Sequence, residues 1–182
     1  MNDLLHPEID RVLIGAEEIN SRVAELANQI NHDYAGEDHL LLIGVLKGAF
    51  IFLSDLARRL RVPHAVDFMA VSSYGMTATS GAVRIVLDLR APIDGIHVLL
   101  VEDIVDTGST LKYLQRVLAS RNPASLRTCV LTRKEGSEAV DVPVDYLGFT
   151  IPDVWVVGYG LDFADTHRTL PYIGVLKPEV YQ

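Results

Sequence analysis

Three carboxylates and a run of small residues stand close together in the middle of the chain. Glu102 and Asp103 follow the apolar run 98–101, and Asp106 comes three positions later. A carboxylate oxygen can accept a hydrogen bond from a sugar diol or bind a hard cation such as Mg2+. The small residues that follow are Thr107, Gly108, Ser109 and Thr110. Where such a run opens a helix, its free N–H groups, its hydroxyls and the positive end of the helix dipole suit a phosphate monoester.

The order of these residues favours a functional site over an ordinary strand end. Solvated acids at the end of a strand, with a Thr or Ser capping the next helix, would explain any one of the residues by itself. However, acids at 102, 103 and 106 repel one another unless a cation or a ligand offsets their charge. A strand, two acids, a third acid, Thr-Gly-Ser-Thr and a helix in that order are far more specific than any member alone.

Alternating strands and helices are expected around this segment. Apolar residues at helical spacing predict a helix over 15–32, a second helix from Phe50 to Leu60, and a third that begins near Leu111. Apolar runs predict buried strands over 40–46, 65–73, 83–89, 97–101 and 125–131. Such alternation indicates an α/β fold with a central, mostly parallel sheet flanked by helices. Ligands bind beyond the carboxyl ends of the strands in these sheets, which is where the acidic segment falls.

The last part of the chain looks different from the rest. Short strand-like runs over 146–151, 155–159 and 172–175 are separated by turn residues, which indicates a small appended lobe rather than another strand–helix–strand unit. Residues 74–82, rich in Gly, Thr and Ser, predict a mobile loop. Since no repeat, low-complexity tract or linker is visible, we expect residues 1–182 to form a single domain.

The composition excludes several classes of protein. The 182 residues include 24 Asp and Glu against 16 Lys and Arg, a formal net charge of -8, whereas general binding to a phosphate backbone needs a basic face. The single cysteine, Cys129, allows no intrachain disulfide, and its apolar surroundings in sequence predict burial. With no secretory signal and no long apolar run in the sequence, we expect a cytoplasmic protein that binds neither nucleic acid nor membranes.

Motifs along almost the whole chain, about 8–181, resemble those of the type I phosphoribosyltransferases. Residues 98–111 are similar to that family's phosphoribosyl-diphosphate signature, and residues 45–48 (Val-Leu-Lys-Gly) are similar to its diphosphate loop. The other matches are 72–75 at the start of a flexible lid, 148–153 and 156–162 in a purine-binding lobe, Arg168, and 170–176. The resemblance is strongest to the bacterial hypoxanthine (hypoxanthine-guanine) enzymes. It implies a type I phosphoribosyltransferase fold with a small hood lobe, here mainly 143–182.

The resemblance implies a reaction of purine salvage. The 5-phosphoribosyl group would pass from phosphoribosyl diphosphate to N9 of hypoxanthine, with guanine as a second expected base, giving IMP or GMP and diphosphate. The transition state would have oxocarbenium character at the anomeric carbon. Asp106 is the implied catalytic residue, facing purine N7 and accepting its proton while N9 attacks. Closure of the lid over 74–82 would keep water from the sugar cation.

The resemblance also assigns residues to the sugar and its phosphates. Glu102 and Asp103 would hold the ribose hydroxyls and Mg2+, with Asp162 as a further metal ligand. The loop 107–110 would bind the 5′-phosphate through Thr107, Gly108, Ser109 and Thr110. The diphosphate contacts would come from Lys47, Gly48, Arg168 and, when the lid closes, Ser73 and Tyr74.

Three further residues are assigned to the base by the same resemblance. Lys134 would donate to purine O6, which explains a preference for 6-oxopurines over adenine, whose 6-amino group cannot accept. Trp155 would stack on the purine ring, and Val156 would supply backbone contacts. The relatives are commonly dimers or tetramers, so we expect a homodimer or a homotetramer.

Two alternatives stay open. One is a phosphoribosyltransferase that prefers xanthine, because residue 154 is Val where some relatives carry a charged residue. The other is an RNA-binding regulator of pyrimidine operons built on the same fold. The net charge of -8 argues against a regulator that needs a basic RNA face, and so does Asp106, because those regulators typically carry an aromatic residue there.

Overall fold

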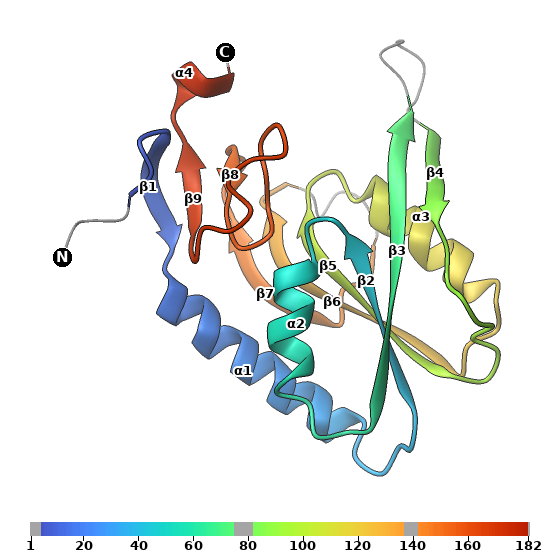
Figure 1. The fold of residues 1–182 in the computed structure, drawn as a ribbon. Helices are drawn as coiled ribbons and strands as arrows, with labels where there is room; N and C mark the ends of the chain where they lie inside the picture. The colour runs from blue at the N-terminus through green and yellow to red at the C-terminus, as the bar shows by residue number, and fades with distance from the viewer. Residues whose placement is uncertain (1–4, 75–81, 137–141, 182) are drawn as a thin grey trace.

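The structure is a computed structural model, and it describes residues 5–74, 82–136 and 142–181. Strands and helices alternate through most of the chain (Figure 1). In order they are β1 (Ile9–Ile14), α1 (Ala16–Asp33), β2 (Leu40–Leu46), α2 (Phe50–Ala57), β3 (His64–Tyr74), β4 (Ala82–Leu87), β5 (His97–Val105), α3 (Ser109–Ala119), β6 (Ser125–Lys134), β7 (Tyr146–Ile151), β8 (Val156–Val157), β9 (Ile173–Leu176) and α4 (Pro178–Tyr181).

A six-stranded sheet forms the centre of the molecule, in the order β4-β3-β2-β5-β6-β7. Every neighbouring pair is parallel except β3 with β4, which is antiparallel. The strands β2, β5, β6 and β7 therefore all end at the same edge of the sheet. This confirms the central, mostly parallel sheet that the apolar runs predict.

Both faces of this sheet are covered by helices, with α1 and α2 on one face and α3 on the other (Figure 1). Alternate residues of β5 divide between the two sides, because successive side chains of a strand point to opposite faces. Leu99 and Val101 pack with the α1 and α2 side chains, whereas Val98 and Leu100 pack with those of α3. A strand buried on both faces has no polar side, which explains the uninterrupted apolar run 97–101. Cys129 is also buried in this core, as its surroundings predict.

A second, three-stranded sheet in the order β1-β9-β8 forms the hood. It is antiparallel throughout, and it joins the two ends of the chain (Figure 1). The sequence gives no clear sign of β1, because register shifts between Ile9 and Arg11 and between Val12 and Ile14 interrupt the regular alternation of a strand. The expected lobe also differs in content: β7 pairs with β6 in the larger sheet, so the hood sheet contains β1 and lacks β7.

Some element boundaries differ from the predicted ones. The strand expected to end at 101 continues through the acidic residues to Val105, because backbone pairing with β6 persists as far as Val105 opposite Arg133. The helix α2 ends at Ala57 rather than near Leu60. The lid expected over 74–82 falls mostly on residues 75–81, outside the described part of the chain. Within the described residues, no helix is long and apolar enough to cross a membrane.

Candidate active site

Four loops at the carboxyl edge of the larger sheet carry most of the predicted site residues. Lys47 follows β2, Asp106 follows β5, Lys134 is the last residue of β6, and Asp153 comes two residues after β7. The parallel register fixes these ends side by side, with Gly44 opposite Val101 and Lys134 opposite Ile151. Residues that are far apart in sequence thus meet where ligands of α/β sheets bind.

The two acids near the end of β5 are held in an environment that disfavours their charge. Glu102 is 8% exposed, and burial, together with the charge of Asp103, raises its pKa well above the usual value. Burial likewise raises the pKa of Asp103 to about 6, although its Oδ1 accepts a hydrogen bond from the Ile104 N–H at 2.9 Å. The Oε2 atom of Glu102 is buried and has no hydrogen-bond partner among the described residues. Paired, buried carboxylates with an unsatisfied oxygen form a donor set that a hard divalent cation would complete.

The start of α3 has the features of an anion site. Gly108 precedes the helix with a φ of 76°, and among the described residues no side chain caps the first turn. Thr107 and Ser109 are exposed, and their hydroxyls lie 3.2 Å apart. The first N–H groups of the helix consequently face outward unsatisfied, where they and the helix dipole favour a phosphate.

Close backbone contacts join the loop after β2 to the end of β5 and to the hood. A Cβ on Gly48 would come within 1.5 Å of Asp103 Oδ2, and one on Gly160 within 1.9 Å of the Gly48 carbonyl oxygen. The hydroxyl of Tyr159 donates to Asp55 Oδ2 at 2.6 Å, which ties the hood loop to α2. The peptide bond between residues 46 and 47 is cis. The loop 47–49 is therefore fixed from both sides, with its backbone next to a buried carboxylate.

Two cations and two carboxylates alternate between this loop and the hood. Lys47 Nζ lies 2.8 Å from Asp165 Oδ1, and Arg168 Nη2 lies 3.1 Å from the same oxygen. Arg168 Nη2 is also 2.7 Å from Asp162 Oδ1, and its Nη1 donates to the Gly160 carbonyl at 2.8 Å. The hydrogen bond from Lys47, and then that from Arg168, lowers the pKa of Asp165. Both predicted diphosphate-binding cations thus share one exposed carboxylate.

Lys134 connects the two acids nearest the hood. Its Nζ lies 3.4 Å from Asp106 Oδ1 and 3.0 Å from Asp153 Oδ1. The lysine side chain is only 14% exposed, while those of Asp106 and Asp153 are 62% and 74% exposed. A proton donor and a carboxylate acceptor therefore stand next to each other at the mouth of the site.

The remaining predicted residues lie in or beside the hood. Trp155 is 51% exposed, and its ring meets those of Phe163 and Tyr181 at centroid distances of 5.7 and 5.6 Å. Val156 is buried in β8 opposite Val175. An exposed indole held by two neighbouring rings can offer a face to a planar ligand.

The chain shares this arrangement with proteins that are already known. A model of the phosphoribosyl transferase domain matches residues 15–164. The chain belongs to the phosphoribosyl transferase family. The type I phosphoribosyltransferase fold expected from the motifs is thereby confirmed, and the solved structures below agree with it.

Relatives of this phosphoribosyltransferase cover nearly its whole length. It is 51% identical to the hypoxanthine-guanine phosphoribosyltransferase of Dictyostelium discoideum, over 94% of this chain and 97% of that protein. It is 53% identical to the enzyme of the same name from Mycobacterium tuberculosis, over 98% of this chain and 92% of that one. The hypoxanthine phosphoribosyltransferase of Trypanosoma cruzi, solved in complex with the product IMP, has a TM-score of 0.91 and 46% identity, covering 98% of this chain and 100% of that chain.

Two carboxylates of this phosphoribosyltransferase enter the site although no role was expected for them. Asp153 is the last residue of the motif 148–153, and its place directly beyond a strand is a signal that could have identified it. Asp165 has no comparable local signal, because its partner Lys47 lies 118 residues away in the chain. The predicted residues Ser73 and Tyr74 end β3, next to the segment that lies outside the described residues.

Proposed function

We propose that this phosphoribosyltransferase transfers the 5-phosphoribosyl group of phosphoribosyl diphosphate to N9 of hypoxanthine and guanine, in purine salvage. The observation that carries the proposal is the contact of Lys134 with Asp106, because it pairs a donor for purine O6 with an acceptor for the proton on N7. The names of the relatives and the IMP complex of the Trypanosoma cruzi protein support the same substrates.

The bonds change at one carbon of the sugar. The N9 lone pair forms the bond to the anomeric carbon while the bond from that carbon to the diphosphate oxygen breaks, and diphosphate leaves with the electron pair. Asp106 accepts the N7 proton, so the base finishes neutral and the carboxylate protonated. Lys134 donates to O6, and adenine is rejected because its 6-amino group would leave this buried donor without an acceptor.

The sugar and its phosphates are assigned to the strand ends and the hood loop. Thr107, Gly108, Ser109 and Thr110 hold the 5′-phosphate at the start of α3. Lys47, Gly48 and Arg168 hold the diphosphate, with Ser73 and Tyr74 added when the lid closes. The two cations must release Asp165 for this, so the diphosphate replaces one carboxylate partner with its own oxygens.

We also propose that Mg2+ is the metal cofactor. Glu102 and Asp103 fit such an ion, because they are oxygen donors whose burial already disfavours their charge, and Glu102 Oε2 lacks a partner in the described structure. Asp162 would contribute a further oxygen. When bound, the ion would neutralise part of the diphosphate charge and so help it to leave.

The base and the assembly complete the proposal. Trp155 stacks on the purine, and Val156 contributes its backbone. We expect a homodimer or a homotetramer in the cytoplasm, which the exposed apolar side chains of Val66, Val86 and Leu87 on neighbouring strands support. Light scattering of the purified protein measures the assembly, and a monomer would contradict this part.

A steady-state assay with four bases tests the substrate. With Mg2+ and phosphoribosyl diphosphate, hypoxanthine and guanine should be converted efficiently, xanthine less so, and adenine hardly at all. A kcat/KM for xanthine above those of both other oxopurines would establish the xanthine-preferring alternative instead. No turnover with any base, together with binding to an RNA leader segment, would favour the regulator.

A further inference from the structure

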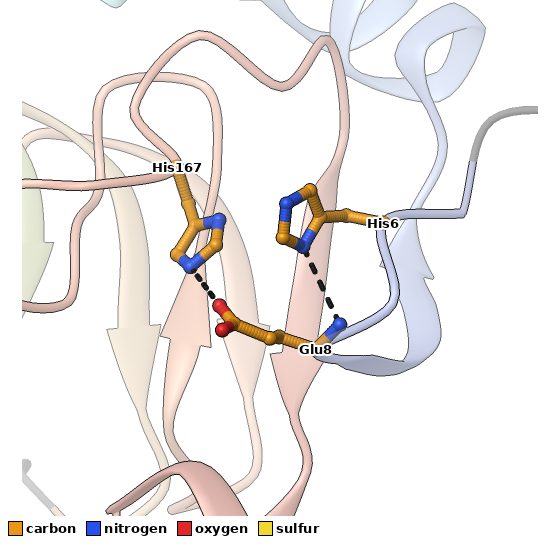
Figure 2. Close-up of side chains that lie close together, drawn as sticks. All are labelled: His6, Glu8 and His167. Carbon is orange, nitrogen blue, oxygen red and sulfur yellow. Dashed lines mark hydrogen bonds and ion pairs between the residues drawn. The ribbon is translucent and has the colours of Figure 1, made fainter.

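Three side chains that could bind a metal meet where the N-terminal segment runs beside the hood loop. His6 and Glu8 precede β1, and His167 lies in the loop between β8 and β9 (Figure 2). One ligand atom of each lies within 4.8 Å of the others. His167 Nε2 is 2.8 Å from Glu8 Oε2, and the rings of His6 and His167 stand edge to face with centroids 4.6 Å apart. None of the three is assigned to phosphoribosyl transfer.

The backbone that carries His6 and Glu8 is held in place by the hood. The His6 N–H donates to the Tyr172 hydroxyl at 3.3 Å, and the His6 carbonyl accepts from the Ile9 N–H at 2.9 Å. The Glu8 carbonyl accepts from the Lys177 N–H at 3.0 Å. The two side chains therefore start from fixed positions, which lowers the entropy that a ligand would have to remove.

His167 is also fixed, and one of its nitrogens is poorly satisfied. Its backbone has a φ of 69°, in the left-handed region that residues other than glycine rarely adopt, and its side chain is 6% exposed. The Nε2 atom is buried, yet its close contact with Glu8 lacks hydrogen-bond geometry, and no other described residue completes a hydrogen bond with it. A cation between the imidazole and the carboxylate would satisfy both groups.

The donor set and the distances suit zinc. Two imidazoles and one carboxylate are a known zinc ligand set that leaves a fourth position for water. With bonds of about 2.0–2.1 Å, the ligand atoms of a tetrahedral ion lie roughly 3.3 Å apart, between the 2.8 Å contact and the 4.8 Å limit found here. Imidazole prefers ions such as Zn2+ to Mg2+. We propose that His6, Glu8 and His167 form a Zn2+ site that joins the N-terminal segment to the loop carrying Asp162 and Arg168.

Calorimetric titration with Zn2+ tests the site. The protein should carry no affinity tag, and excess Mg2+ should occupy the carboxylates near β5. We expect one equivalent of Zn2+ to bind, and His6→Gln, Glu8→Gln and His167→Asn each to weaken binding by at least about tenfold, since even second-shell changes at metal sites cost 10–100-fold. Asn is chosen at 167 because it tolerates a positive φ. The exposed residue His39 lies outside the cluster, so His39→Gln should bind Zn2+ like the wild type.

Two results would overturn the proposal. One is the absence of one-equivalent binding to the wild type, and the other is binding that none of the three cluster variants weakens. The exposed His6 variant keeps the test valid even if His167→Asn unfolds. Co2+ gives a second reading: an intense tetrahedral visible spectrum that His6→Gln abolishes supports the site, and a purely six-coordinate spectrum contradicts it.

Discussion

The backbone of Gly48 lies directly against the carboxylate of Asp103, and even a methyl group on that glycine would overlap the Oδ2 atom at 1.5 Å. Gly160 of the hood packs on the other side of Gly48 in the same way. The loop after β2, the end of β5 and the hood therefore meet at one point that has no room for a side chain. This contact sets the distance between the proposed diphosphate loop and the proposed metal-binding carboxylates.

Gly48→Ala should damage catalysis more than folding. The added methyl must push the loop or Asp103 aside, and a shift of about 1 Å at a catalytic site can cost about 10²-fold in rate. We expect kcat/KM for phosphoribosyl diphosphate to fall by about that factor in a steady-state assay. Gly15→Ala is the matched control, because nothing lies within 4 Å of its added Cβ. Equal activity of the two variants would show that the contact is unimportant.

The raised pKa of Asp103 predicts how the stability of the metal-free protein depends on pH. Its usual pKa of 3.8 becomes about 6 in the folded state, so between these values the native protein binds more protons than the unfolded chain. The free energy of unfolding should therefore fall as pH rises from about 4 to about 6. The raised pKa of Glu102 acts in the same direction.

Asp103→Asn should remove this dependence and stabilise the metal-free protein at pH 7.5. A shift of about two units corresponds to roughly 1 to 3 kcal/mol. Denaturant unfolding in the presence of a chelator measures the difference, which should largely disappear at pH 4, where Asp103 is protonated when folded. A variant that is less stable than the wild type at pH 7.5 would refute the assignment of the burial cost to this carboxylate.

Much of this site follows from local patterns in the sequence, and the rest depends on contacts between distant segments. The apolar runs predict the parallel strands, and those strands place Asp106 and Lys134 at one edge. No local pattern marks Asp165, because its interaction with Lys47 exists only once the hood packs on the loop. The strand β1 is hidden for a different reason, since its irregular register breaks the period of two that strand prediction relies on.

Lys134→Ala should relax the choice of base. A hydrogen bond from a charged donor contributes about 1.5–3 kcal/mol, which corresponds to roughly 10–100-fold. The ratio of kcat/KM for hypoxanthine to that for adenine should fall by about this factor, mainly through loss of hypoxanthine use. The exposed Lys112 of α3 offers a control, as Lys112→Ala should keep the ratio. An unchanged ratio in Lys134→Ala would exclude this lysine from base selection.

Trp155 should contribute to base binding through its ring. Stacking of an aromatic side chain on a base is worth about 1–3 kcal/mol when removed by alanine, so Trp155→Ala should raise KM for hypoxanthine roughly tenfold or more. Trp155→Phe keeps an aromatic face and should retain most of the affinity. KM for phosphoribosyl diphosphate, measured in parallel, should change little in both. If Trp155→Ala keeps the wild-type KM for the base, the indole does not stack on it.

The most direct measurement is the formation of IMP and diphosphate from hypoxanthine and phosphoribosyl diphosphate by the wild type and by Asp106→Asn, side by side. The wild type should release one IMP and one diphosphate for each phosphoribosyl diphosphate consumed. Asp106→Asn should lower kcat by about 10²–10⁴, the usual contribution of a general base, while its dissociation constant for phosphoribosyl diphosphate stays close to that of the wild type. No IMP from the wild type, or an Asp106→Asn variant that turns over at the wild-type rate, would contradict the proposed reaction.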